Sequence, residues 1–189
     1  MSQRDDLVLD LRTLLLGLGE DPSREGFERT GIRAAEAWEE RLRGYTLDPG
    51  EILATTFENE DEPGKGLQLI ENIFFSSTCE HHWLPFTEWC SVAYIPSTRV
   101  VGLSKVVRVV DCFAQRMQIQ ERMTAQIADA LYGHEELAPR GVAVVVSAKH
   151  VCCLGRGVKR EGMNFVTTTR RGAVEMQLLQ TMTQKIRRA

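Results

Sequence analysis

Cysteine and histidine side chains gather in two short segments of this 189-residue chain. The first segment consists of Cys79, Glu80, His81 and His82. Cys79 and His82 stand three residues apart, a spacing that lets both side chains reach one metal ion from a single turn. Polar side chains of this type would be costly to bury between two apolar stretches without a partner. A chance cluster on a surface loop is the competing interpretation, and we favour a metal site.

The second segment begins with His150, directly after an apolar run at residues 142–148. If the chain remains extended there, His150 and Cys152 point to the same side, because side chains alternate along a strand. Cys152 is therefore the predicted third ligand. The remaining thiols are expected to be small or neutral side chains of the interior: Cys90, Cys112 and Cys153.

Together, Cys79, His82 and Cys152 form a ligand set of the kind that zinc prefers. Three protein ligands leave a fourth coordination position for water, as in catalytic zinc sites. One interpretation is that His81 or His150 closes that position and the zinc is structural. In the other, both histidines stand beside the metal as acid and base, because the pKa of histidine suits proton transfer near neutral pH.

Positively charged residues lie near both segments. Lys105 and Arg108 fall in the first turns of a helix for which Ser104 is the expected N-cap. Arg156 stands between two glycines, and its planar guanidinium suits phosphate. Lys159 is expected to be a solvated surface residue.

A carboxylate, Glu121, lies at the start of the next expected helix. It could simply complement the helix dipole. A carboxylate also accepts two parallel N–H bonds, which is the pattern presented by the N1 and 2-amino edge of guanine. Both readings stay open at this point.

Periodic patterns predict the elements that must position these residues. Helices are expected before Gly17, from Pro22 to Gly44, after Ser104, and from Ile119 to Gly133. Strands are expected at 67–75, 91–95, 142–148 and 165–176. A β-β-α-α-β-β order favours an antiparallel sheet with both helices on one face. The loop 59–66 divides the chain into a helical arm with linker, residues 1–66, and a core, residues 67–189.

Composition bounds the function classes. Hydrophobic residues make up 43% of the chain and charged residues 26%, as in soluble globular proteins. No apolar run is long enough to span a membrane, and the N-terminal residues lack the pattern of a signal peptide, so we expect a cytoplasmic location. The net charge of −3 gives no indication of nucleic-acid binding.

The motifs around these residues resemble those of the GTP cyclohydrolase I family. The similarity extends from about residue 20 to about residue 172 and keeps the order of the motifs. The matching segments are Glu20–Gly26 with Arg33, Ser77–His82, Val92–Pro96, Gly102–Arg108, Gln115–Arg116, Gln118–Thr124, Gly141–Val144, His150–Cys152 and Arg156–Val158.

The resemblance implies a fold, an assembly and a reaction. The fold is the α+β T-fold, an antiparallel four-stranded sheet with two helices on one face, preceded by an N-terminal helical arm. The assembly is a homodecamer of two pentamers with active sites between subunits. The reaction is the Zn2+-dependent hydrolysis of GTP to 7,8-dihydroneopterin triphosphate and formate, the first step of pterin and folate-type biosynthesis.

The resemblance also implies roles for single residues. The zinc ligands are Cys79, His82 and Cys152, and the catalytic residues are His81, His150 and Ser104. The guanine-reading pair is Gln120 and Glu121. The residues that hold ribose and triphosphate are Lys105, Arg108, Arg156 and Arg33, again with Ser104.

Some positions depart from the family pattern. A proline is usual at Gly31, a glycine at Glu88, and a serine and a threonine at Met163 and Phe165. A zinc- and nucleotide-binding relative without catalysis is the main alternative function, although retention of both histidines argues against it. The pattern expected of zinc nucleobase deaminases is absent, and nothing in the sequence supports a nitrile reductase.

Overall fold

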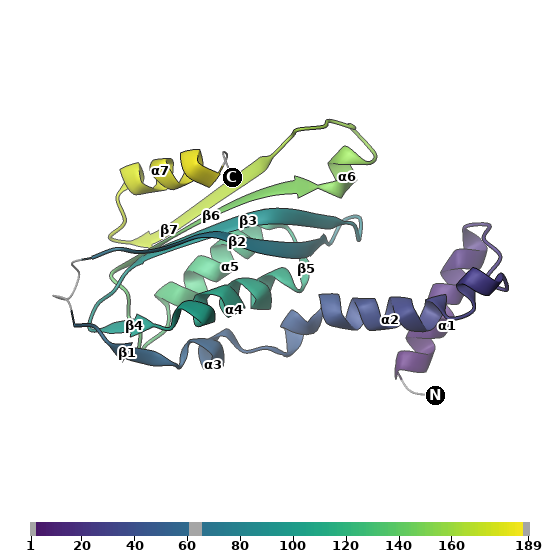
Figure 1. The fold of residues 1–189 in the computed structure, drawn as a ribbon, viewed down its shortest axis with the longest axis horizontal. Coiled ribbons are helices and arrows are strands. Elements are labelled where there is room, and N and C mark those ends of the chain that lie inside the picture. Colours follow the sequence, from purple (N-terminus) through teal and green to yellow (C-terminus); the bar gives the residue numbers. More distant parts are fainter. Residues whose placement is uncertain (1–2, 61–65, 187–189) are drawn as a thin grey trace. The chain divides into compact units, whose positions relative to one another are not determined.

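The computed structural model describes residues 3–60 and 66–186 (Figure 1). The chain separates into two compact units, one up to Arg43 and one from Gly44 onward. The boundary expected at residue 66 thus falls inside the second unit. Among the described residues, no helix has both the length and the apolar character needed to cross a membrane.

The first unit is a pair of packed helices. It contains α1 (Gln3–Gly17), the short 3-10 helix η1 (Glu25–Phe27) and α2 (Thr30–Arg41). The helix expected from Pro22 to Gly44 is therefore interrupted, and its regular part begins only at Thr30. A Cβ at Gly31 would lie 2.9 Å from Cγ1 of Val8 in α1, so the two helices approach closely at this position. Glycine at position 31, where the family usually has proline, therefore allows α1 and α2 to pack closely.

The second unit is built on a five-stranded sheet in the order β5-β2-β3-β6-β7. Its strands are β2 (Gln68–Cys79), β3 (Pro85–Ile95), β5 (Met117–Gln118), β6 (Gly141–His150) and β7 (Phe165–Gly172). The four long strands are antiparallel to their neighbours, as predicted, and the two-residue β5 adds a parallel edge beside Cys79. A second, two-stranded sheet pairs β1 (Thr56–Glu58) with β4 (Arg99–Val101).

Two amphipathic helices cover one face of the sheet, as the element order predicts. They are α4 (Leu103–Ala114) and α5 (Gln120–Tyr132), and the short α3 (Pro49–Leu53) lies against α4. A shared core forms where Val106 and Val110 of α4 and Ile127 of α5 meet the apolar side chains of β2, β3 and β6. The N-cap of α4 is Gly102, so the expected cap at Ser104 is wrong, and the helix begins one residue before Ser104.

The opposite face of the sheet carries α7 (Met176–Ile186) (Figure 1). The strand expected to run to Met176 ends instead at Gly172, whose φ of 63° turns the chain. Leu179, Met182 and Ile186 then pack on the second face of the sheet. Their spacing is helical, and the sequence interpretation overlooked it.

The strand register brings the chemistry-bearing segments to one end of the sheet. Phe86 at the start of β3 pairs with Ser77 near the end of β2 on one side and with His150 at the end of β6 on the other. Cys79 pairs with Gln118 of β5, directly before the first turn of α5. The ends of β2 and β6 and the beginning of α5 therefore meet. The expected strand 91–95 was too short, because β3 already begins at Pro85.

Candidate active site

A tight turn after β2 presents the first two ligand-type side chains. The backbone carbonyl of Cys79 accepts hydrogen bonds from the N–H groups of His82, at 3.3 Å, and Trp83, at 2.8 Å. Cys79 Sγ lies 3.6 Å from Nδ1 of His82 and 3.8 Å from Nδ1 of His81. The turn thus holds one buried thiol and two exposed imidazoles close together, as the three-residue spacing predicts.

The third ligand arrives by a different route from the one expected. The chain does not stay extended after His150, because it enters the four-residue helix α6 (Val151–Leu154). The alternation argument for Cys152 was therefore wrong, although the residue itself is in place. Within the described residues, the ligand atoms of Cys79, His82 and Cys152 all lie within 4.8 Å of one another. Burial, together with the neighbouring thiols, raises the pKa of Cys152 to about 11.

This donor set fits a zinc ion. Two thiols that can ionise and one imidazole are ligands of the type that zinc takes in tetrahedral sites. Among the described residues, the group of ligand atoms that converge on one point consists of Cys79, His82 and Cys152, and we call it the convergent group. His81 and His150 are not members of it. The arrangement therefore favours three protein ligands over the closed four-ligand site of a structural zinc.

His150 is held beside this group by two kinds of contact. Its ring stacks on Phe86, with 4.6 Å between centroids and 1° between planes. Its Nε2 lies 2.9 Å from Oε1 of Gln120. Burial lowers the pKa of His150, and the negative charge of Glu121 acts in the opposite direction. The imidazole is therefore kept mainly neutral near pH 7.

Gln120 is itself fully engaged inside the protein. Its Nε2 lies 3.1 Å from the carbonyl of Val146, 2.9 Å from that of Phe165 and 3.1 Å from Oγ1 of Thr167. With the amide nitrogen facing three acceptors, the oxygen must face His150. Because that oxygen can only accept, the proton of the neutral imidazole sits on Nε2, and Nδ1 is the nitrogen left to accept one.

A pocket of about 410 Å³ opens beside the convergent group. It is lined by Cys79, His81, His82, Gln118, Ile119, Gln120, Glu121, His150, Cys152, Cys153, Met163, Asn164 and Phe165. Glu121 is exposed at its wall. Cys153, expected in the core, is half-buried and lines this pocket, whereas Cys90 and Cys112 are buried as predicted. Two positions that depart from the family pattern, Met163 and Phe165, also face it, and Asn164 between them gave no signal in the sequence.

The expected phosphate-binding residues of the second unit do not line this pocket. The first turn of α4, with Ser104 and Lys105, lies beside the beginning of β2, where Leu103 lines a hollow with residues 68–70. Cys79 is at the other end of the same strand, roughly 25–30 Å away for nine strand residues with a bulge at Asn72. Arg108 is on the next turn of α4, and it is not among the residues that line the pocket.

The other two residues expected to bind phosphate are Arg156 and Arg33. Arg156 is exposed after α6 and does not line the pocket. Arg33 belongs to the first unit, where its guanidinium donates to the carbonyl of Gly26 at 3.1 Å and to Oγ1 of Thr30 at 3.2 Å. The second unit therefore brings together the metal-ligand group, both histidines, Gln120 and Glu121, whereas Ser104, Lys105, Arg108 and Arg156 of the same unit do not line the pocket.

The chain matches the family described as GTP cyclohydrolase I over residues 8–187. It is 49% identical to the GTP cyclohydrolase 1 of Brucella anthropi over 173 residues, which make up 92% of this chain and 79% of that protein. It is 49% identical to the GTP cyclohydrolase 1 of Brucella canis over 159 residues, 84% of this chain and 73% of that protein. Among solved structures, archaeosine synthase QueF-Like in the apo form aligns with a TM-score of 0.46 at 19% identity, covering 61% of this chain and 100% of that one. The family resemblance inferred from the motifs is confirmed.

Proposed function

The chain belongs to the GTP cyclohydrolase I family, and we propose that it hydrolyses GTP to 7,8-dihydroneopterin triphosphate and formate with a zinc ion held by Cys79, His82 and Cys152. The observation that carries this proposal is the convergence of the three ligand atoms within 4.8 Å. They lie at the wall of a pocket that also contains two histidines and an exposed carboxylate.

Cys79, His82 and Cys152 would hold the zinc ion, which would lower the pKa of a water molecule so that it can act as the nucleophile. The protein residues around it supply proton transfer. His150 receives its orientation from Gln120 and Phe86, and its Nδ1 is the atom that accepts and returns a proton. His81 is exposed beside the ligand group, where it can exchange protons with solvent as the ring opens.

Glu121 is the residue proposed to read the guanine base. Its carboxylate lies at the pocket wall, where it can accept both N–H bonds of the N1 and 2-amino edge. The side chain of Gln120 has its amide hydrogens directed at protein acceptors, so we assign it to the support of His150. Guanine recognition by side chains then rests on Glu121.

A complete site needs a second copy of the chain. Ser104 and Lys105 lie beside the opposite end of β2, roughly 25–30 Å along the sheet from the metal ligands, too far to hold the triphosphate of the same substrate molecule, and Arg108 follows on the next turn of α4. We propose that a neighbouring subunit supplies them, in a homodecamer of two pentamers. A head-to-tail contact of this kind joins unlike surfaces and closes into a ring. Arg156 and Arg33 are proposed to complete the phosphate contacts in that assembly.

A cytoplasmic location is part of the proposal. All five cysteines are free thiols. A reducing compartment keeps such thiols available as metal ligands.

Incubation of the zinc-loaded protein with GTP tests the function. Formate should appear, and fluorescent neopterin should appear after oxidation of the product. Cys79→Ala should lose zinc and turnover together, whereas His81→Ala should keep zinc and lose turnover. Bound zinc and GTP without either product would instead identify a non-catalytic nucleotide-binding protein, and full turnover in zinc-free protein would exclude the metal chemistry.

A further inference from the structure

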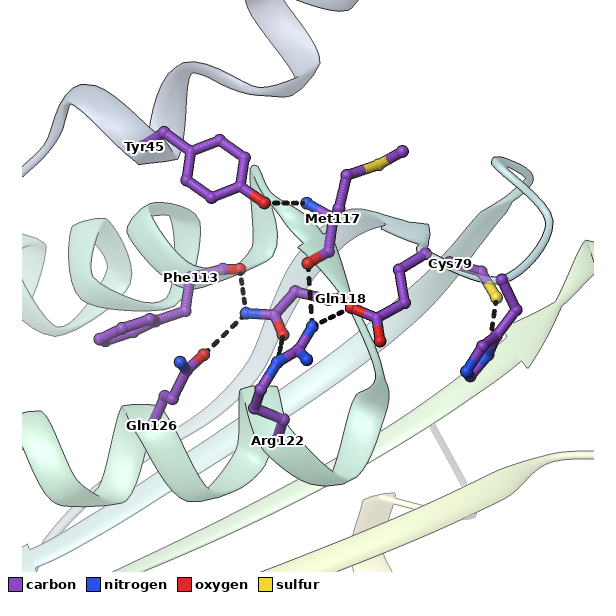
Figure 2. Close-up of polar contacts among 9 residues, drawn as sticks. Tyr45, Cys79, Phe113, Met117, Gln118, Arg122 and Gln126 are labelled. Carbon is purple, nitrogen blue, oxygen red and sulfur yellow. Dashed lines mark hydrogen bonds and ion pairs between the residues drawn. The ribbon is translucent and has the colours of Figure 1, made fainter.

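Arg122 lies one residue beyond Glu121 on α5, and its guanidinium contacts two other segments of the chain, β5 and the turn after β2 (Figure 2). Its Nε donates to Oε1 of Gln118 at 3.0 Å, and Nη2 donates to the carbonyl of Met117 at 3.1 Å. Nη2 also forms an ion pair with the carboxylate of Glu80. The guanidinium therefore joins α5, the short strand β5 and the turn after β2.

The partner amide of Gln118 is fixed in one orientation. Gln118 is buried, and its Nε2 donates to the carbonyl of Phe113 at 3.0 Å and to Oε1 of Gln126 at 2.8 Å (Figure 2). Both amide hydrogens are thus used, which leaves Oε1 to face Arg122. The cradle for the guanidinium is therefore preformed.

Glu80 stands between a metal ligand and a histidine of the site. Its backbone N–H donates to the carbonyl of Gln118 at 3.0 Å, and its side chain reaches Arg122. The hydrogen bond from Arg122 lowers the pKa of the Glu80 carboxyl, so the pair is charged at neutral pH. The ligand turn is consequently attached to the helix side of the pocket by both backbone and side chain.

We propose that Arg122 is a positioning residue for the metal centre, which fixes the turn carrying Cys79 and His82 against the first turn of α5. This inference rests on the zinc site of the proposed function. Arg122 contacts no ligand atom itself, and it acts through the Glu80 carboxylate. Groups that hydrogen-bond metal ligands commonly change metal affinity by about 10- to 100-fold when they are replaced, and because Arg122 acts one contact further away, we expect an effect at the lower end of that range.

The geometry predicts that lysine cannot replace Arg122. The three contacts need donors spread over a planar fork, whereas lysine offers one nitrogen. Arg122→Lys keeps the charge and the aliphatic stem, and the backbone bond from Glu80 to Gln118 remains, so the fold should persist. The variant therefore separates positioning of the turn from folding of the domain.

The test compares three full-length variants with the wild-type protein: Arg122→Lys, Glu80→Gln and their combination. Zinc dissociation constants are measured by competition with a chromophoric chelator. We expect about tenfold weaker binding in each single variant, and no further weakening in the double variant because both act through one contact. In cobalt-substituted protein, the ligand-field absorption bands should shift in Arg122→Lys.

Arg171→Lys is the matched control. Arg171 of β7 forms an ion pair at 2.6 Å with Asp129 of α5, the helix that also carries Arg122. Neither Arg171 nor Asp129 lines the pocket. This variant should keep the zinc affinity and the cobalt spectrum of the wild type. Arg122→Lys with zinc affinity within about twofold of wild type and an unchanged cobalt spectrum would overturn the inference alone. Absence of Cys79-dependent zinc binding in the wild type would overturn the proposed function with it.

Discussion

Replacement of Gln120 by methionine is expected to remove the group that orients His150 while keeping the size and helix preference of the side chain. Gln120 is 1% exposed, so no water replaces its lost bonds. Its oxygen lies 2.9 Å from Nε2 of the imidazole, and its nitrogen faces three acceptors. In the variant the ring would still stack on Phe86, but nothing on α5 would select its tautomer.

The expected loss of stability in Gln120→Met follows from the number of hydrogen bonds that the Gln120 side chain makes. Two amide hydrogens and one oxygen make three hydrogen bonds at a time, each contributing about 1 kcal/mol, so the free energy of unfolding should fall by about 2–3 kcal/mol. General acid–base catalysis contributes about 10²–10⁴-fold to a rate. Because His150 remains present but loses its orientation, we expect kcat to fall toward the lower end, about 100-fold. KM should change little, because Glu121 is untouched.

Thr167→Val is the control for this experiment. Thr167 accepts from the same amide nitrogen at 3.1 Å and shares a 2.6 Å hydrogen bond with Thr124, but it does not touch His150. It should cost about 1–2 kcal/mol of stability and leave kcat near the wild-type value. Denaturant unfolding and steady-state kinetics measure both quantities. If the two variants lose kcat in proportion to their loss of stability, the orienting role of Gln120 is refuted.

Three other predictions can be checked with the same protein. Zinc affinity measured between about pH 6 and pH 8 should rise about tenfold per pH unit for the proton that Cys152 releases, because its pKa of about 11 lies above this window and the thiol must ionise to bind metal; a flat profile would contradict this. Mixed oligomers of Lys105→Ala and His81→Ala should regain activity in about a quarter of their sites, because each site combines two copies; no recovery on remixing would argue for sites within one subunit. Glu88 has a φ of 148°, a conformation that favours glycine. In denaturant unfolding, the free energy of unfolding of Glu88→Gly should therefore exceed that of Glu88→Ala by about 1–2 kcal/mol. Equal free energies of unfolding would exclude backbone strain at this position.

The sequence was most informative where residue chemistry or long periodicity constrained the structure. The helix expected from Ile119 to Gly133 is present as α5, with Met123, Ile127 and Leu131 in the core and Gly133 at the helix end, whereas Ile119 is its N-cap and is half-buried. The cluster around Cys79 was recognisable because ligand-type side chains rarely occur together between apolar strands. These features depend on local spacing, which a sequence displays directly.

Features that depend on long-range pairing were less accessible. The edge strand β5 has two residues, too few for any periodicity, and it is defined only by its pairing with Thr78 and Cys79 of β2. The break at Gly172 depends on a positive φ, which a sequence does not display directly. Arg122 and Glu80 are far apart in the chain, and their ion pair forms only in the folded protein. Both residues belong to recognised motifs, but the sequence alone assigned neither of them a role.

The position of Cys152 shows why the short helix α6 is required for the metal site. The strands β2 and β6 are separated by β3, so their backbones lie about 10 Å apart. An extended continuation would carry Cys152 a further ~7 Å along the strand direction and would leave that lateral separation unchanged. The turn at Val151 instead redirects the chain, and the thiol comes within 4.8 Å of the other ligand atoms. A one-residue slip of β6 against β3 would turn His150 to the opposite face and displace this turn, so zinc binding should select the native register of the sheet.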